Sequence, residues 1–208
     1  MNTQFQSSNP SIVKSIRQRE LLNAWLRALR KPKPLPSLLD FKPERINDDE
    51  LADMMGFNVE GDGVAARYVI THEGARLTAT YGNEHVDPAE RTNRYLDDAI
   101  GADRYARVVP SYRACVAWKR PTYSISMVRD GDGKDVSYER LLLPFGPAER
   151  VEQIVGSYKA ISFDGGFKVN NLMGIRPHNL PVVAINAVID QEPARRPIAL
   201  PDDVVEIV

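Results

Sequence analysis

The apolar positions near the start of the chain recur at helical spacing. The residues that would share one face are Ile12, Ile16, Leu22, Trp25, Leu26 and Leu29. Charged residues, many of them arginine, occupy the other positions, as in an amphipathic helix. Pro10 suits a first helical turn, and the three prolines of KPKPLPS cannot continue a helix. The pattern therefore predicts one amphipathic helix from about residue 11 to 30.

Shorter apolar runs predict five strands further along the chain. Residues 51–60 and 64–70 form two arms around the turn Gly61-Asp62-Gly63. Residues 122–130, 135–146 and 151–163 form three more strands, which are linked as hairpins. The long connection between the second and third strands carries a short helix near 75–82, a loop over 83–94 and a longer helix that begins near Gly101. Pro110 is expected to kink or split that helix. This order of elements predicts an α+β fold with an antiparallel sheet.

The last part of the chain has a different character. Residues 164–208 hold five of the fifteen prolines and show no sustained period. Two apolar pieces, 182–190 and 204–208, are either strands or segments that dock on a partner. The predicted organisation is an N-terminal helix and linker over 1–36, an α+β domain over 37–163 and a flexible, Pro-rich extension over 164–208.

Composition narrows the class of protein. The 208 residues include 27 Lys and Arg against 28 Asp and Glu, which excludes a strongly basic nucleic-acid binder. The single cysteine excludes an internal disulfide and any multi-cysteine metal site. The sequence contains no apolar run long enough for a membrane span, and its polar start lacks the pattern of a secretory signal. We therefore expect a cytoplasmic protein with no nucleic-acid partner and no membrane span.

The order of two strands, a helical crossover and three antiparallel strands resembles the PAS fold. The sequence itself resembles the PAS-like family of short alphaproteobacterial proteins over about residues 20–163. The most specific matches are residues 138–144 (YERLLLP) and the preceding 120–123 (RPTY). Weaker matches are LLNAW at 21–25, LPS at 35–37, RYVI at 67–70, Gly74, YG at 81–82, YLD at 95–97 and IVG at 154–156. The chain departs from the family pattern at Asp53, at Asn58 and over 71–73 (THE), which alters the expected shape of the pocket.

This resemblance implies a PAS-like five-stranded antiparallel sheet that curls against the crossover helices and encloses a small-molecule pocket. The side chains expected to line that pocket are Phe57, Tyr68, Ile70, Leu77, Tyr81, Tyr112, Val116, Tyr123, Ile125 and Tyr158. The alternative is that these side chains fill a core at normal packing density. The abundance of tyrosine favours a ligand, because a buried hydroxyl needs a hydrogen-bond partner.

Strand alternation separates two charged candidates. Tyr138 and Arg140 share one face of their strand, and Glu139 lies on the other. Arg140 is a candidate to pair with an acidic group of a ligand or of a partner, with a cross-strand or loop ion pair as the alternative. Cys115 lacks the Asn-Cys-Arg-Phe-Leu type of motif found in flavin-adduct PAS domains, and it is expected to be a buried apolar residue. We predict no metal and no cofactor. Haem is the alternative, with His72 or His85 as the iron ligand.

The function expected from these features is binding rather than catalysis. The sequence contains no G-x-S-x-G, H-E-x-x-H, Walker A or G-x-G-x-x-G motif. We expect a non-enzymatic sensory module that binds an unknown small molecule or a protein partner and signals through association. The apolar stripe of the first helix must be buried on its own sheet or on another subunit, and we expect a homodimer through it. The alternatives are a small α+β enzyme with a pocket carboxylate such as Glu139 or Asp97, and an interaction adaptor without a ligand.

Overall fold

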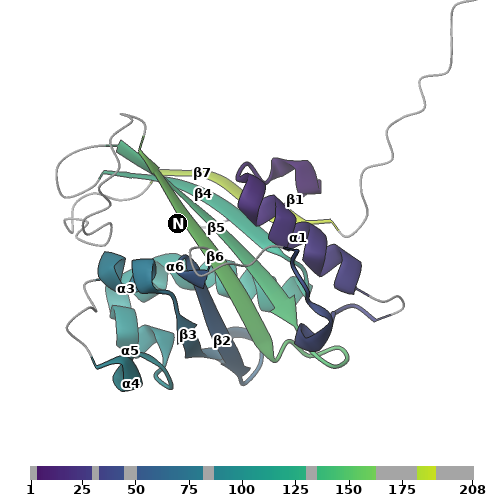
Figure 1. The fold of residues 1–208 in the computed structure, drawn as a ribbon, viewed down its shortest axis with the longest axis horizontal. Coiled ribbons are helices and arrows are strands. Elements are labelled where there is room, and N and C mark those ends of the chain that lie inside the picture. The colour runs from purple at the N-terminus through teal and green to yellow at the C-terminus, as the bar shows by residue number, and fades with distance from the viewer. Residues whose placement is uncertain are drawn as a thin grey trace, which may run out of the picture.

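An α+β fold built on a seven-stranded, mostly antiparallel open sheet is seen in the computed structural model (Figure 1). The structure describes residues 4–29, 33–44, 51–81, 87–129, 135–162 and 182–190. From edge to edge the strands are β1 (Gln6–Ser8), β7 (Val182–Ile189), β4 (Thr122–Arg129), β5 (Asp135–Phe145), β6 (Gln153–Ser162), β2 (Met54–Glu60) and β3 (Arg67–Glu73). β1 and β7 are parallel, and every other neighbouring pair is antiparallel.

The five predicted strands are confirmed as β2 to β6. The turn between β2 and β3 depends on its glycines, because Gly61 has a φ of 77° and Gly63 a φ of 59°, which side chains with a Cβ rarely adopt. A short 3-10 turn, η3 (Gly63–Ala65), completes this connection. The connection between β4 and β5 lies outside the described residues. β5 continues through Pro144 to Phe145, so Pro144 belongs to the strand and the connection to β6 begins at Gly146.

The prediction of a five-stranded sheet was wrong, because two further strands extend the edge at β4. β7 pairs with β4, and β1 pairs with β7. Asp190, directly after β7, joins three parts of the chain: its carboxylate accepts hydrogen bonds from Ser7 and from Arg120, and its backbone N–H donates to Ser8 O at 2.8 Å. The apolar segment 182–190 is therefore a strand of the sheet, and 204–208 lies outside the described residues.

Four helices cover one face of the sheet, which we name the inner face. They are α3 (Ala75–Tyr81), α4 (Pro88–Arg91), α5 (Leu96–Ile100) and α6 (Ala102–Trp118). Pro110 lies inside α6, which continues past it rather than being split. α4 replaces part of the loop expected over 83–94, and its first turn is capped by Asp87, whose Oδ1 accepts a hydrogen bond from Ala89 N at 2.8 Å. Among the described helices, none is long and apolar enough to cross a membrane.

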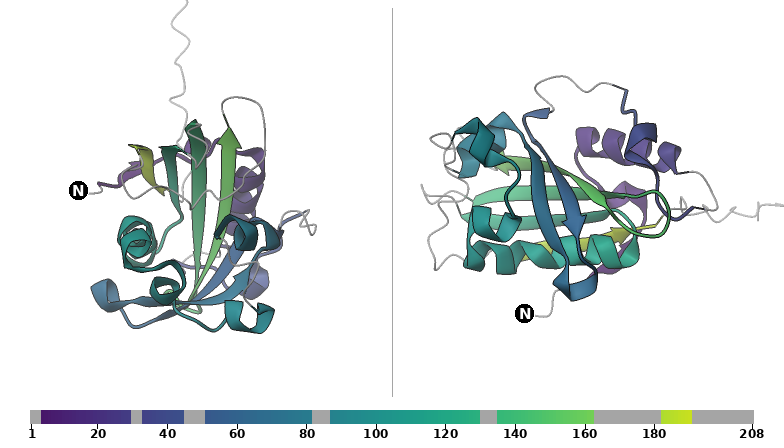
Figure 2. Two further views of the ribbon diagram at one scale, coloured as in Figure 1. Left: turned by 90° about the vertical axis from the view of Figure 1, so that its left-hand side faces the viewer. Right: turned by 90° about the horizontal axis from the view of Figure 1, so that it is seen from below.

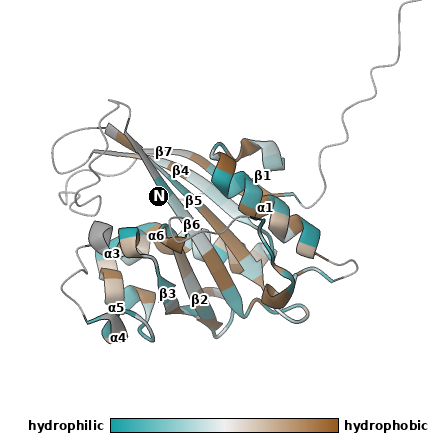
Figure 3. Ribbon diagram, in the orientation of Figure 1, coloured by the Kyte–Doolittle hydropathy of each residue, from teal (hydrophilic) through white to brown (hydrophobic). Residues whose placement is uncertain are grey.

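The first helix, α1 (Ile16–Ala28), covers the opposite face, which we name the outer face (Figure 2). It begins later than predicted, because residues 13–15 are extended after a separate 3-10 turn, η1 (Pro10–Ile12). Its apolar side packs on the sheet of its own chain, while hydrophilic bands mark its other side (Figure 3). Trp25 is fully buried there, and its Nε1 donates to Pro144 O at 2.7 Å. A further 3-10 turn, η2 (Leu38–Asp40), follows.

The sheet is thus buried on both faces and separates two cores. The inner core includes Phe57, Tyr68, Leu77, Tyr112 and Tyr158, under α3, α5 and α6. The outer core, under α1, includes Leu22, Trp25, Tyr123, Leu141 and Phe145. Neighbouring residues of one strand therefore belong to different cores, and this division decides which of the predicted site residues meet.

Candidate functional site

Tyrosine rings gather on the inner face at the junction of β2, β3, β5, β6 and α6. We name Phe57, Tyr68, Tyr112, Tyr138 and Tyr158 the inner aromatic cluster. The Tyr112 ring contacts the Phe57 ring edge-on, with centroids 5.2 Å apart, and lies 5.0 Å from the Tyr68 ring. The hydroxyls of Tyr112 and Tyr158 are hydrogen-bonded at 2.6 Å. Helix α6 is therefore tied to the sheet by a polar bond inside an otherwise aromatic contact.

The hydroxyl of Tyr68 differs from that pair. Tyr68 is 0% exposed, and its hydroxyl has no hydrogen-bond partner among the described residues. Burial raises the pKa of Tyr68 above its ordinary value, so the phenol keeps its proton at neutral pH. A buried hydroxyl without a partner costs about 1–3 kcal/mol. The Tyr68 hydroxyl is therefore a buried polar atom that a further hydrogen-bonding group would satisfy.

Gly156 on β6 makes room for one ring of the cluster. The Tyr158 ring folds back over it, so that a Cβ placed on Gly156 would lie 2.7 Å from the Tyr158 hydroxyl and 2.8 Å from Cε2. Real Cβ atoms do not approach so closely. The absence of a side chain at Gly156 therefore fixes the position from which Tyr158 reaches Tyr112.

Polar side chains adjoin the cluster along β5 and β4. Arg140 lies on the inner face, where its Nη1 donates to Ser111 Oγ of α6 at 3.3 Å. Its guanidinium carbon is 5.9 Å from the centroid of the Tyr138 ring. Ser124 is the cross-strand partner of Arg140 and is buried. The predicted sharing of one face by Tyr138 and Arg140 is confirmed, and a guanidinium stands beside the aromatic rings.

The structure brings most of the predicted pocket residues together and separates two of them. The residues that meet in or against the inner core are Phe57, Tyr68, Ile70, Leu77, Tyr112, Val116 and Tyr158. Placing Tyr123 and Ile125 with them was wrong, because both belong to the outer core. On β4 it is Thr122 and Ser124 that face inward. The side chain of Tyr81 lies outside the described residues.

The two candidate carboxylates do not lie in the inner aromatic cluster. Glu139 is buried on the outer face, where it is hydrogen-bonded to the Tyr123 hydroxyl, which also accepts a hydrogen bond from Lys14 N at 3.1 Å. Burial raises the pKa of Tyr123. Asp97 on α5 pairs with Arg67 instead, with Oδ2 2.9 Å from Nη2. Each carboxylate therefore has a structural partner.

Of the two histidines named as haem ligands, the structure describes His72. His72 is exposed on β3, with Nε2 3.4 Å from Leu51 O, and His85 and His178 lie outside the described residues. Cys115 is fully buried, and burial raises the pKa of its thiol. The prediction that Cys115 is a buried apolar residue is confirmed. Within the described ranges, no three His, Cys, Asp or Glu side chains form a group that could hold a metal ion.

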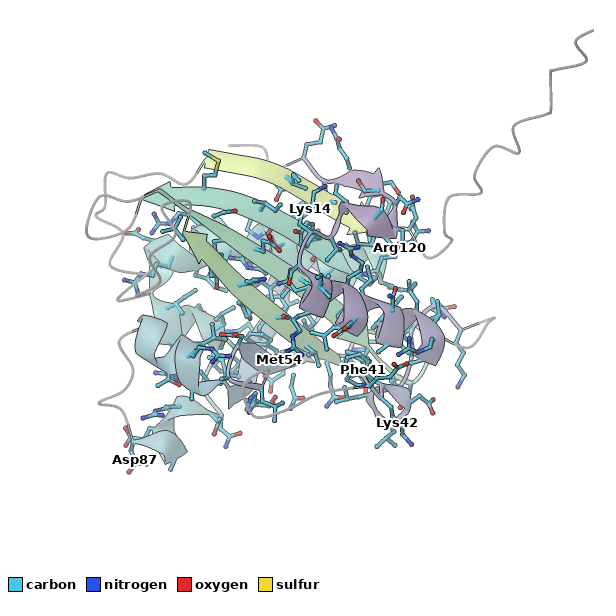
Figure 4. All side chains as sticks on the ribbon, turned by 45° about the horizontal axis from the view of Figure 1, so that its top comes forward. Lys14, Phe41, Lys42, Met54, Asp87 and Arg120 are labelled. Atoms are coloured by element: carbon cyan, nitrogen blue, oxygen red, sulfur yellow. The ribbon has the colours of Figure 1, made fainter. Side chains whose placement is uncertain are left out.

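A concave site that the sequence pattern did not predict lies on the outer face between α1 and β6. This outer groove has a volume of about 440 Å³. Its lining includes Arg17, Gln18, Leu21, Asp53, Ser157 and Lys159. Met54, labelled in Figure 4, also lines it from the start of β2. The sequence feature that indicates this groove is Gln18. It is a polar residue within the apolar stripe of the helix, four positions before Leu22 and seven before Trp25.

Comparisons of the chain with protein-family models, with curated proteins and with solved structures find no match.

Proposed function

We propose that the chain is a non-enzymatic, PAS-like sensory module that binds a small molecule at the inner aromatic cluster and signals through its association state. The observation that carries this proposal is the hydroxyl of Tyr68, which is buried without a partner among the described residues. A ligand with an aromatic or apolar body and a hydrogen-bonding atom would satisfy it. Sites that take such ligands are mostly apolar, with a few polar groups that fix orientation.

Two further features support this proposal. The chain order β2, β3, helices α3 to α6, β4, β5, β6 agrees with the PAS-like order expected from the sequence. Arg140 and Ser124 place polar groups at one side of the aromatic rings. An acidic group of the ligand would bind there, and its apolar part would lie toward Tyr68.

An enzyme is the less favoured candidate. Catalysis by a pocket carboxylate requires that carboxylate to reach the substrate. Glu139 lies on the opposite face of the sheet from the cluster, and Asp97 is paired with Arg67. An adaptor without a ligand is favoured by one observation, the direct bond between the Tyr112 and Tyr158 hydroxyls, which closes that part of the cluster. The experiment below distinguishes it from a sensor.

We also propose that the chain associates through α1, but through a different face of this helix from the apolar face that the sequence predicts. Leu22 and Trp25 are buried on the sheet of the same chain, so they cannot also form a dimer contact. Ile16 is the large apolar residue of α1 that stays 70% exposed. We expect Ile16→Lys to convert a homodimer into a monomer in size-exclusion chromatography with light scattering. An unchanged mass would remove α1 from the interface.

The ligand is tested by comparing native and denatured masses of the freshly purified protein. We expect an additional mass under native conditions in the wild type, and its loss in Tyr68→Phe. The matched control is Tyr95→Phe, because the Tyr95 hydroxyl bonds Glu60 at the surface, 2.8 Å away. A visible absorption spectrum of the same sample tests haem and flavin. A wild type without additional mass, together with a Tyr68→Phe variant of raised stability, would overturn the sensor in favour of the adaptor.

A further inference from the structure

The outer groove contains buried polar atoms that the described residues leave unpartnered. Gln18 is 1% exposed and Ser15 is 4% exposed, and both line the groove. Gln18 Nε2 donates to Ser157 O at 3.0 Å, which fixes the amide and leaves Oε1 without a donor. The Ser15 hydroxyl stands at the start of α1, but it makes no capping bond and has no partner. A hydrogen-bond donor is therefore required at Gln18, and a polar partner is required at Ser15.

Most of the charges around the groove neutralise one another. Arg76 forms two hydrogen bonds with Asp53, at 2.9 and 3.0 Å, and Arg27 Nη2 lies 3.3 Å from Glu44 Oε1. Two charged side chains of the lining, Lys159 on β6 and Glu20 on α1, make no ion pair or hydrogen bond with another described residue. The groove thus presents an available ammonium and an available carboxylate in addition to the carbonyl oxygen of Gln18.

Lys159 also has a carboxylate neighbour that does not neutralise it. Glu139 is its direct cross-strand partner on β5, so both lie on the outer face. The Glu139 side chain is hydrogen-bonded to Tyr123, and its Oε2 is buried without a partner. Glu139 is buried and does not itself line the groove, so among the described residues the unpaired carboxylate of the lining is that of Glu20.

We propose that the outer groove binds a small zwitterion of the α-amino acid class. Its carboxylate lies against Lys159 and the Ser15 hydroxyl, and its ammonium donates to Gln18 Oε1. A simple anion would leave Gln18 Oε1 unsatisfied and would approach a carboxylate. A simple cation would approach the ammonium of Lys159. A ligand that carries a carboxylate and an ammonium on one carbon atom satisfies all of these groups, and the groove has room for a side chain beyond them.

The proposal is tested on the full chain by thermal unfolding and titration calorimetry. The probes are glycine and larger free L-amino acids. Acetate and methylammonium, which each carry one of the two charged groups of glycine, are also tested, each alone. We expect at least one amino acid to raise Tm by roughly 5–10 °C at about a hundred times its Kd. Acetate and methylammonium should each give little change. A full shift with either ion alone would overturn the assignment to zwitterions.

Variants locate the site. Lys159→Met removes the ammonium and Gln18→Leu removes the carbonyl oxygen, and each should weaken binding by roughly 10–100-fold. The matched control is Lys42→Met, an exposed lysine that Figure 4 places near the C-terminal end of α1 and that does not line the groove. Equal binding by wild type, Lys159→Met and Gln18→Leu would place the ligand elsewhere. No binding by the wild type would leave only ordered water at these atoms. Either result overturns the proposal.

Discussion

Replacing Gly156 by alanine tests whether the inner aromatic cluster is packed as described. The added Cβ would lie 2.7 Å from the Tyr158 hydroxyl, so the ring must move away from Tyr112. Overpacking of this kind costs about 1–3 kcal/mol, and the loss of the bond between the hydroxyls of Tyr112 and Tyr158 adds about 1 kcal/mol. Alanine also lowers the conformational entropy of the unfolded chain, which offsets about 0.4–1 kcal/mol of this destabilisation. The net expectation is a loss of about 1–3 kcal/mol in the free energy of unfolding.

Urea denaturation measures this loss, and a second background shows its cause. In Tyr158→Ala the ring is absent, so Gly156→Ala should there be neutral or slightly stabilising. The difference between the two backgrounds is the coupling of the two positions. If Gly156→Ala costs the same with and without the Tyr158 ring, the close approach is not the reason for the glycine, and the reasoning about the cluster is refuted.

Three further predictions concern the rest of the molecule. Trp25→Phe removes the donor to the Pro144 carbonyl and should lower the free energy of unfolding by about 1–3 kcal/mol in urea denaturation; an unchanged midpoint would contradict the bond. Burial raises the pKa values of Cys115 and Tyr68, so the unfolded chain loses these protons first, near pH about 8.5 and 10 respectively. Tm should therefore hold steady below pH about 8 and fall above it, and Tyr68→Phe should flatten the part of the fall above pH about 10. Asp190→Asn should speed amide hydrogen exchange in β1 and β7 while changing the free energy of unfolding by at most about 1 kcal/mol, and unchanged exchange would show that Asp190 does not join these strands.

Local pattern predicted most strands and helices of the fold, but it did not predict which face each side chain takes. The alternation of β4 indicated correctly that Tyr123 and Ile125 share a face. It could not show that this is the outer face, because α1 covers that face with an apolar core of its own. When both faces of a sheet are buried, the apolar residues of a strand no longer mark one side.

Two strands and one site depended on contacts between distant segments. β1 is Gln-Ser-Ser, which has no strand signal of its own, and it forms because β7 presents an open edge to it. The outer groove arises where Gln18 meets Ser157 across the fold. A glutamine inside an apolar stripe marks such a site, but its partner is set only when the helix packs on the sheet.

The pairing of β1 with β7 has a consequence for the order of events during synthesis. β7 follows the other six described strands of the sheet in chain order, so β4 has an unpaired edge until β7 has been synthesised. Such an edge is open to strands of other chains. We therefore expect nascent or truncated forms that lack β7 to need protection from self-association, and full-length protein to lose that need once Ile189 and Asp190 are in place.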